Sequence, residues 1–195
     1  KREVIQLVTP GTLMEGKGVS AKENNFLTAL AFDNQQYGLS YVDLTTGELC
    51  STTLEDEDSV LNEASALQTK EIVLTDDKIP DSLKETLKNR LGVVFSTQED
   101  DQTNAELEFL TDGLSVELEK KVTSKLLRYL LLTQKRSLDH IQKAQSYEVD
   151  HYLKMDHYSK ANLELSQSIR TGKKHGTLLW LLDETKTAMG GRLLK

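Results

Sequence analysis

Four carboxylates in the first half of the chain are nominal candidates for binding divalent metal ions. They are Asp33, Asp43, Glu63 and Asp76. Enzymes that cleave phosphodiester bonds with two metal ions use carboxylates that converge from several strands and helices. Asp33, however, falls in a predicted turn after an apolar segment and not within that segment. We therefore expect the four groups to be solvated carboxylates of turns and surfaces, and we keep a metal-dependent nuclease as the alternative.

Two histidines recur in Asp-His-Tyr triplets at residues 150–152 and 156–158. A separation of six residues does not suit two ligands on one helix face, and no cysteine or third histidine accompanies them, so we expect no zinc site. The serine, histidine and aspartate residues form no nucleophile-elbow motif. The sequence also contains neither a complete Walker A loop nor a G-x-G-x-x-G motif. These patterns predict no catalytic, cofactor-binding or metal-binding set.

A basic loop is predicted at residues 168–176. It contains Arg170, Lys173 and Lys174. Basic side chains of this kind can bind a phosphate backbone, although a basic loop usually provides solubility. Phosphate contact by these three residues is therefore the candidate binding role, and a solvated loop is its alternative.

Charge is unevenly distributed along the chain. Residues 21–120 carry twenty-two acidic and seven basic groups, whereas residues 121–195 carry seven acidic and fourteen basic groups, within a total net charge of −7. A strongly acidic domain is a poor ligand for phosphates. The middle of the chain should therefore not bind nucleic acid. The change of sign coincides with a change in the secondary-structure pattern and predicts a domain boundary.

Composition also bears on the cellular compartment. The single cysteine, Cys50, cannot form an intramolecular disulfide and fits a reducing compartment. No apolar segment approaches the roughly 18 residues that a membrane span needs, and there is no signal-peptide pattern. We expect a cytoplasmic protein that does not bind membranes.

The order of predicted elements indicates a mixed sheet followed by helices. Strands are expected at residues 24–33, 37–43, 48–53, 71–74 and 93–95, and helices at residues 58–68 and 81–89. Antiparallel strands followed by helix-linked strands favour one mixed sheet with helices on its faces. A long helix with two apolar stripes is then expected from about Ser115 to Lys143, its basic residues forming a solvated face rather than a DNA contact.

The last forty residues predict short helices. Asp156 is a candidate N-cap for a helix that carries Tyr158, Ala161, Leu165 and Ile169 on one face. Thr177 and Thr187 are candidate N-caps for two further short helices. The pair Gly190-Gly191 would cost a helix interior about 1 kcal/mol per residue, so it predicts close backbone approach to a neighbour or a helix break.

The segment from Leu182 to Leu194 resembles a signature of the MutS family of DNA mismatch-repair proteins, L-D-x-T-x-T-x-M-G-x-R-L-L. The matching residues are Leu182, Asp183, Thr185, Thr187, Met189, Gly190, Arg192, Leu193 and Leu194. Two further stretches resemble the family, R-E-V-I-Q-x-x-T-P-G-T at residues 2–12 and M-D-x-x-S-x-x-N-L-E-L at residues 155–165. The middle of the chain resembles it mainly through the order of its elements.

The resemblance implies a division of the chain. Residues 1–17 would be the exit strand and linker of a mismatch-binding domain. Residues 18–114 would be the connector domain, an α/β mixed sheet similar to ribonuclease-H-like folds, and residues 115–195 the first helices of an all-α core (lever) domain. The chain would then be one part of a longer protein, with the mismatch-reading residues upstream and the ATPase motifs downstream.

The function implied is that of a non-catalytic segment of a mismatch-recognition protein. It would link mismatch sensing to the ATPase core and offer part of the surface that recruits MutL. Mismatched duplex DNA, a second copy of the protein, ATP and magnesium would be ligands of the full-length protein. The alternatives are a ribonuclease-H-like nuclease that uses the four carboxylates and a DNA-binding module that uses the basic C-terminal half.

One consequence concerns self-association. If later segments normally cover the core helices, their apolar residues are exposed in this chain. These residues are Leu178, Leu179, Trp180, Leu182, Leu193 and Leu194. An exposed apolar patch of this kind favours association, so we expect the chain to associate with itself through this end.

Overall fold

A computed structural model describes residues 9–12, 25–75, 78–97, 105–134, 138–149, 155 and 157–194. The chain forms two compact units. The sheet unit comprises Lys1–Met14 and Asn25–Val149, and the C-terminal unit comprises Glu15–Asn24 and Asp150–Lys195. No helix among the described residues is long and apolar enough to cross a membrane.

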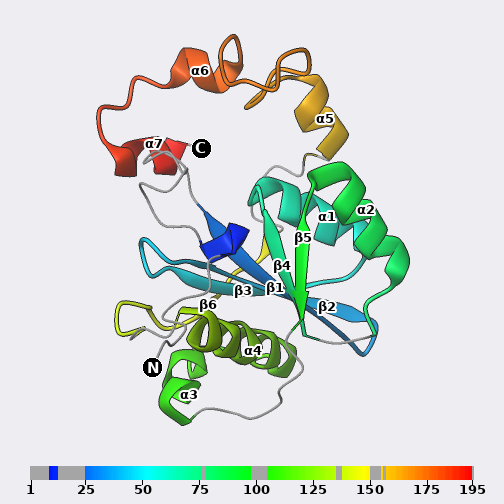
Figure 1. Ribbon diagram of the computed structural model, residues 1–195, viewed down its shortest axis with the longest axis vertical. Helices are drawn as coiled ribbons and strands as arrows, with labels where there is room; N and C mark the ends of the chain where they lie inside the picture. The colour runs from blue at the N-terminus through cyan, green and yellow to red at the C-terminus, as the bar shows by residue number, and fades with distance from the viewer. Residues whose placement is uncertain are drawn as a thin grey trace, which may run out of the picture. The chain divides into compact units, whose positions relative to one another are not determined.

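The sheet unit is built on one six-stranded mixed sheet in the order β5-β4-β1-β2-β3-β6 (Figure 1). The first three strands form an antiparallel meander; they are β1 (Phe26–Asp33), β2 (Gln36–Asp43) and β3 (Leu49–Leu54). The other three pair in parallel; they are β4 (Glu71–Leu74), β5 (Val94–Thr97) and β6 (Gln145–Ser146). The predicted mixed sheet is therefore confirmed, including all five predicted strands.

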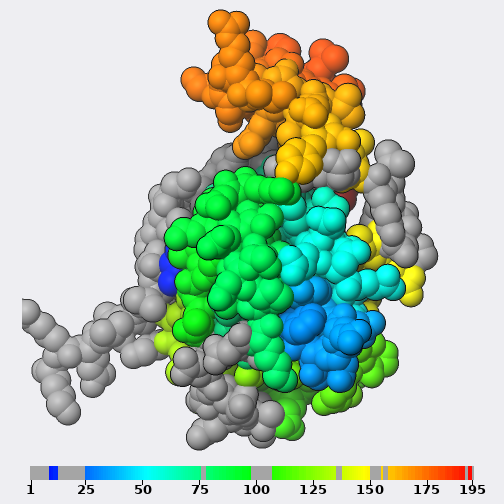
Figure 2. Space-filling model, turned by 90° about the vertical axis from the view of Figure 1, so that its right-hand side faces the viewer, coloured from blue at the N-terminus to red at the C-terminus, as the bar shows by residue number. Residues whose placement is uncertain are grey.

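Helices cover both faces of this sheet. One layer holds α1 (Glu57–Ala66) and α2 (Asp81–Leu91), and the other holds α3 (Ala105–Thr111) and α4 (Glu117–Gln134). Alternate residues of β1 face opposite layers, since Leu27 and Ala29 pack in the cluster of α4 while Leu30 packs in the cluster of α1 and α2. The apolar segment predicted to be buried on both faces is thus the central strand. Figure 2 shows the α1 and α2 layer from outside, in cyan and green.

Turn chemistry sets the registers that position these layers. The β1–β2 hairpin turns at Asn34 and Gln35, whose φ angles are 49° and 63°, as tight hairpins require. The turn after β2 ends at Gly47, where φ is +76° and the N–H donates to the Asp43 carbonyl oxygen at 2.8 Å. Asp56 caps α1, its Oδ1 accepting from the Ser59 N–H at 2.7 Å.

The long helix predicted from Ser115 to Lys143 is wrong in its second half. The helix α4 ends at Gln134, and the chain then crosses to pair as β6 with β3. Leu138 and Ile141 have the spacing of a helical apolar stripe, but they lie in a loop that places them in the same apolar cluster as α4. The structure also groups α4 and β6 with the sheet, since α4 packs on β1, β2 and β3; the resemblance implies the core domain for residues 115–195.

The C-terminal unit contains short helices in its described part. They are α5 (His157–Asn162), α6 (Leu178–Leu182) and α7 (Ala188–Leu194). The helix predicted to reach Ile169 ends at Asn162, and Glu164 follows with a φ of +47°, which a continuing helix does not allow. The predicted N-cap Asp156 lies outside the described residues. Leu179 is half-buried, and α6 has no fully buried residue.

Candidate functional site

Two threonines begin the helices of the C-terminal motif, as predicted. The Thr177 side chain is almost fully buried, and its Oγ1 accepts from the Trp180 N–H at 3.2 Å and donates to the Lys174 carbonyl oxygen at 2.7 Å. Thr187 does the same for α7, where its Oγ1 accepts from the Gly190 N–H at 3.0 Å. Both hydroxyls satisfy N–H groups that a helix start leaves unpaired.

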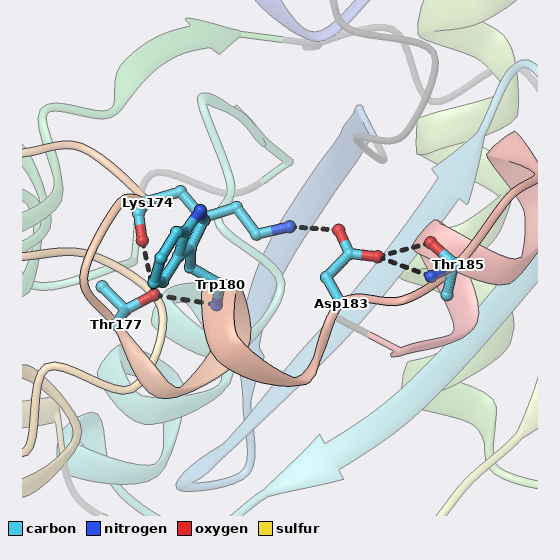
Figure 3. Close-up of polar contacts among 5 residues, drawn as sticks. All are labelled: Lys174, Thr177, Trp180, Asp183 and Thr185. Atoms are coloured by element: carbon cyan, nitrogen blue, oxygen red, sulfur yellow. Dashed lines mark hydrogen bonds and ion pairs between the residues drawn. The ribbon is translucent and has the colours of Figure 1, made fainter.

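Asp183 closes the turn that follows α6. One carboxylate oxygen accepts from the backbone N–H of Thr185 at 3.2 Å and from its hydroxyl, and the other pairs with the ammonium group of Lys174 (Figure 3). The hydrogen bond from Lys174, followed by that from Thr185, lowers the pKa of Asp183 below the ordinary aspartate range. Signature positions 183, 185 and 187 therefore fix a turn between two helices rather than forming a reactive site.

The glycine pair lies inside α7 and does not break it. A Cβ added to Gly190 would lie 3.1 Å from Thr187 Oγ1 and 3.5 Å from Thr185 Cβ. A side chain at position 190 would press on the capping threonine Thr187. The atoms it would meet are side-chain atoms of Thr185 and Thr187, so neither predicted reason for the pair, close backbone approach to a neighbouring element or a helix break, is confirmed.

The basic loop is held by its own backbone. The Gly172 N–H donates to the Ser168 carbonyl oxygen at 2.8 Å, and the Ser168 N–H donates to the Lys173 carbonyl oxygen at 2.9 Å. Of the three predicted phosphate contacts, Lys174 is the one paired with Asp183. Arg170 and Lys173 are exposed. The structure thus separates one structural lysine from two surface cations.

An aromatic pair that we did not predict lies beside this loop. The His175 ring stacks on the Trp180 ring with centroids 4.3 Å apart and planes tilted by 43°. Trp180 retains 47% of its exposure. The spacing of five residues along the chain gives no sequence signal for this contact, because the turn at Thr177 brings the rings together. Trp180 is also the single tryptophan of the chain, so its fluorescence reports on this turn.

Two of the four candidate metal-binding carboxylates, Asp33 and Asp43, lie at opposite ends of one hairpin. Asp33 pairs with Gln36 at one end of the β1–β2 hairpin, and Asp43 pairs with Phe26 at the other. Seven strand residues of about 3.4 Å each separate the two carboxylates by roughly 24 Å. No group of three or more His, Cys, Asp or Glu side chains that could hold a metal occurs within the described ranges.

Each described carboxylate of that set has its own partner. Asp33 lies 3.9 Å from the Lys78 ammonium group, and Glu63 accepts a hydrogen bond from the Tyr147 hydroxyl at 2.7 Å. Asp43 is buried, and its Oδ1 accepts from both the N–H and the hydroxyl of Thr45. Our expectation of a solvated group is therefore wrong for Asp43, which closes a turn. Asp76 lies outside the described residues.

Comparisons with known proteins cover both units. Residues 25–142 match the family model described as MutS domain II, and residues 159–195 match MutS domain III. The DNA mismatch repair protein MutS of Listeria innocua is 49% identical over 197 residues, and that of Geobacillus sp. (strain WCH70) is 49% identical over 196 residues. Each alignment covers all of this chain and 23% of the relative, so the chain spans about a quarter of these relatives' length.

Proposed function

Because this chain belongs to the MutS family of DNA mismatch-repair proteins, we propose that it links mismatch sensing to the ATPase core and offers part of the surface that recruits MutL. The observation that carries this proposal is the succession of two family domains, II on the sheet unit and III on the C-terminal unit. The chain is a non-catalytic part of the family's architecture, and its site residues fix turns and helix ends.

The charge distribution supports a protein partner for the sheet unit. Residues 21–120 are strongly acidic, and such a surface repels a phosphate backbone. In this proposal, mismatched duplex DNA, the second copy of a homodimer, ATP and magnesium are ligands of the whole protein in the cytoplasm. The described residues of this chain gather no set of carboxylates that would suit magnesium.

We also propose a ribonuclease-H-like fold for the connector domain and an all-α core for the rest. The strand order β3-β2-β1-β4-β5, with the first three antiparallel and the last two parallel, supports the first assignment. The three short helices of the C-terminal unit support the second. The pairing of β6 with β3 and the packing of α4 favour a connector that extends to about residue 149.

Phosphate contact by the basic loop is a second and narrower proposal. Arg170 and Lys173 are exposed on a loop whose backbone hydrogen bonds fix its shape, which leaves both side chains open to a DNA backbone. If they contact phosphates, the double variant Arg170→Gln, Lys173→Gln reduces the salt slope of duplex affinity by about two. Affinity that is independent of salt in the unchanged chain would contradict this proposal. Lys121→Gln is a control for lost charge elsewhere.

Self-association is also proposed, through the exposed apolar residues of α6 and α7. Leu193 is 91% exposed and Met189 is 77% exposed, and apolar side chains exposed together favour association. Sedimentation should show a concentration-dependent dimer that Leu193→Ser weakens. A monomer at every concentration up to the millimolar range would contradict the proposal.

The test of the main proposal is binding of this chain to purified MutL, with and without mismatched duplex. Binding without DNA is expected if the recruiting surface lies in this chain. The variant Leu193→Ser serves as a control, because adhesion through the exposed apolar end falls with this change whereas a specific contact on the sheet unit does not. The absence of MutL binding both with and without mismatched duplex would contradict the adaptor role.

A further inference from the structure

A fully buried carboxylate lies where four elements of the sheet unit meet. Glu71 is the first residue of β4 and is 0% exposed. Its Oε1 accepts hydrogen bonds from the Ser96 hydroxyl of β5 and the Tyr129 hydroxyl of α4, both at 2.7 Å. Its Oε2 accepts from the Gly11 N–H at 2.8 Å. A buried carboxylate is stable only with such donors, and one of them comes from a segment sixty residues away.

That segment is a compact turn, η1 (Pro10–Thr12), the short blue helix beside β1 in Figure 1. The Thr12 N–H donates to the Thr9 carbonyl oxygen at 3.0 Å, and the Thr9 N–H donates to Thr12 Oγ1 at 2.8 Å. The Asn25 amide donates to the Pro10 carbonyl oxygen at 3.1 Å. The turn is thus closed on itself and tied to the residue that precedes β1.

The docking position favours glycine. A Cβ added to Gly11 would lie 2.7 Å from Leu27 Cδ1, 3.0 Å from Glu71 Oε2 and 3.1 Å from Glu71 Cβ. At distances this short, a side chain at position 11 requires either the Leu27 side chain or the turn to move. Thr12 is also almost fully buried, so the turn fills a site rather than lying across a surface.

We propose that Glu71 is an intramolecular receptor that docks the Thr9-Pro10-Gly11-Thr12 turn, so that residues 9–12 are mechanically tied to β4, β5 and α4. The resemblance implies an exit strand and linker for residues 1–17, whereas residues 9–12 belong to the sheet unit. The inference does not rest on the proposed function, because it follows from contacts within the sheet unit alone.

The receptor couples its partners through one carboxylate. Displacement of the turn removes the only donor to Oε2 among the described contacts of Glu71, which leaves a buried anionic oxygen without its hydrogen bond. Loss of the Tyr129 hydroxyl removes a hydrogen bond to Oε1 of the same carboxylate. Loss of the α4 contact should therefore lower the stability of the docked turn, and displacement of the turn should lower the protection of α4.

Amide hydrogen exchange of the full 195-residue chain tests this proposal. In the unchanged chain the Gly11 amide should be protected, and Gly11→Ala should speed exchange at residues 9–12 by about tenfold to a hundredfold, the range for a lost hydrogen bond to a charged group. Exchange at Leu30 and Leu39 in the central strands should not change. An unprotected Gly11 amide in the unchanged chain, or equal protection in Gly11→Ala, overturns the proposal.

Two further variants separate coupling from local damage. Tyr129→Phe keeps the ring and removes only the hydroxyl, which interacts with both Glu71 and Thr9, and it should speed exchange of the Gly11 amide. Glu71→Gln leaves one acceptor oxygen for donors on two sides and should do the same. The control Glu85→Gln makes the same change on an exposed carboxylate of α2 and should have no effect. A Gly11 amide as protected in Tyr129→Phe as in the unchanged chain overturns the coupling.

Discussion

Leu127→Ala tests whether α4 is part of the sheet unit. Leu127 is fully buried in the cluster that also contains Leu27, Ala29 and Val42 of the sheet. Truncation removes three carbons at about 0.8 kcal/mol each, and the cavity left behind adds to this, for a total loss of about 3 to 4 kcal/mol. That loss is a large fraction of the stability of a domain this size, about 5 to 15 kcal/mol.

The assay is urea unfolding followed by circular dichroism, together with amide exchange at β1. If α4 is integral to the sheet unit, Leu127→Ala lowers the unfolding midpoint of one transition in which the strands and α4 melt together. Leu132→Ala is the matched control, because Leu132 lies on the same helix and is 50% exposed; it should cost less than about 1 kcal/mol. A loss under 1 kcal/mol for Leu127→Ala, or strands that stay protected while α4 melts, would refute the reasoning.

Three other changes have outcomes that follow from single contacts. Burial raises the pKa of Glu119, whose Oε2 is buried without a hydrogen-bond partner. The free energy of unfolding should therefore fall as the pH rises from the ordinary glutamate range through the raised pKa. Glu119→Gln should remove this pH dependence and stabilise the chain at pH 7 by about 1 kcal/mol, as measured by urea titration across pH. Gly47→Ala should destabilise by at least about 2 kcal/mol, since its Cβ would lie 2.1 Å from a backbone carbonyl oxygen at a φ of +76°, whereas Gly92→Ala, with nothing within 4 Å, should cost only about 1 kcal/mol of backbone strain. Because the pKa of Asp183 is lowered, its contacts with Lys174 and Thr185 persist as the pH falls through the ordinary aspartate range and are lost only below that range. The emission of Trp180 should therefore shift in acid, and Asp183→Asn should produce that shift at neutral pH.

Local signals predicted the strands and the helix caps well. The apolar residues of β1 and the alternating apolar residues of β2 were recognisable because each segment must be buried, whichever strand it pairs with. Thr177 and Thr187 were recognisable as caps because a cap bonds to a residue three positions away. Such contacts are complete within one turn of chain, and the sequence therefore contains all of the information that specifies them.

Contacts made across the fold could not be predicted in the same way. Leu138 and Ile141 continue the spacing of α4, and only the return of the chain to β3 shows that they lie in a loop. Glu71 opens a predicted strand, where a charged residue suggests exposure, yet its donors come from residues 11, 96 and 129. Lys174 was a candidate phosphate contact because its partner Asp183 is nine residues away, on the far side of α6.

In the proposed role, this chain is an adaptor whose sheet unit contacts MutL. Its most direct test is amide hydrogen exchange of the chain alone and with a saturating amount of purified MutL, without DNA. The proposal predicts new protection within residues 25–149 and none at Arg170 and Lys173. Protection confined to the basic loop or to α6 and α7, or no change anywhere in the chain, would contradict it.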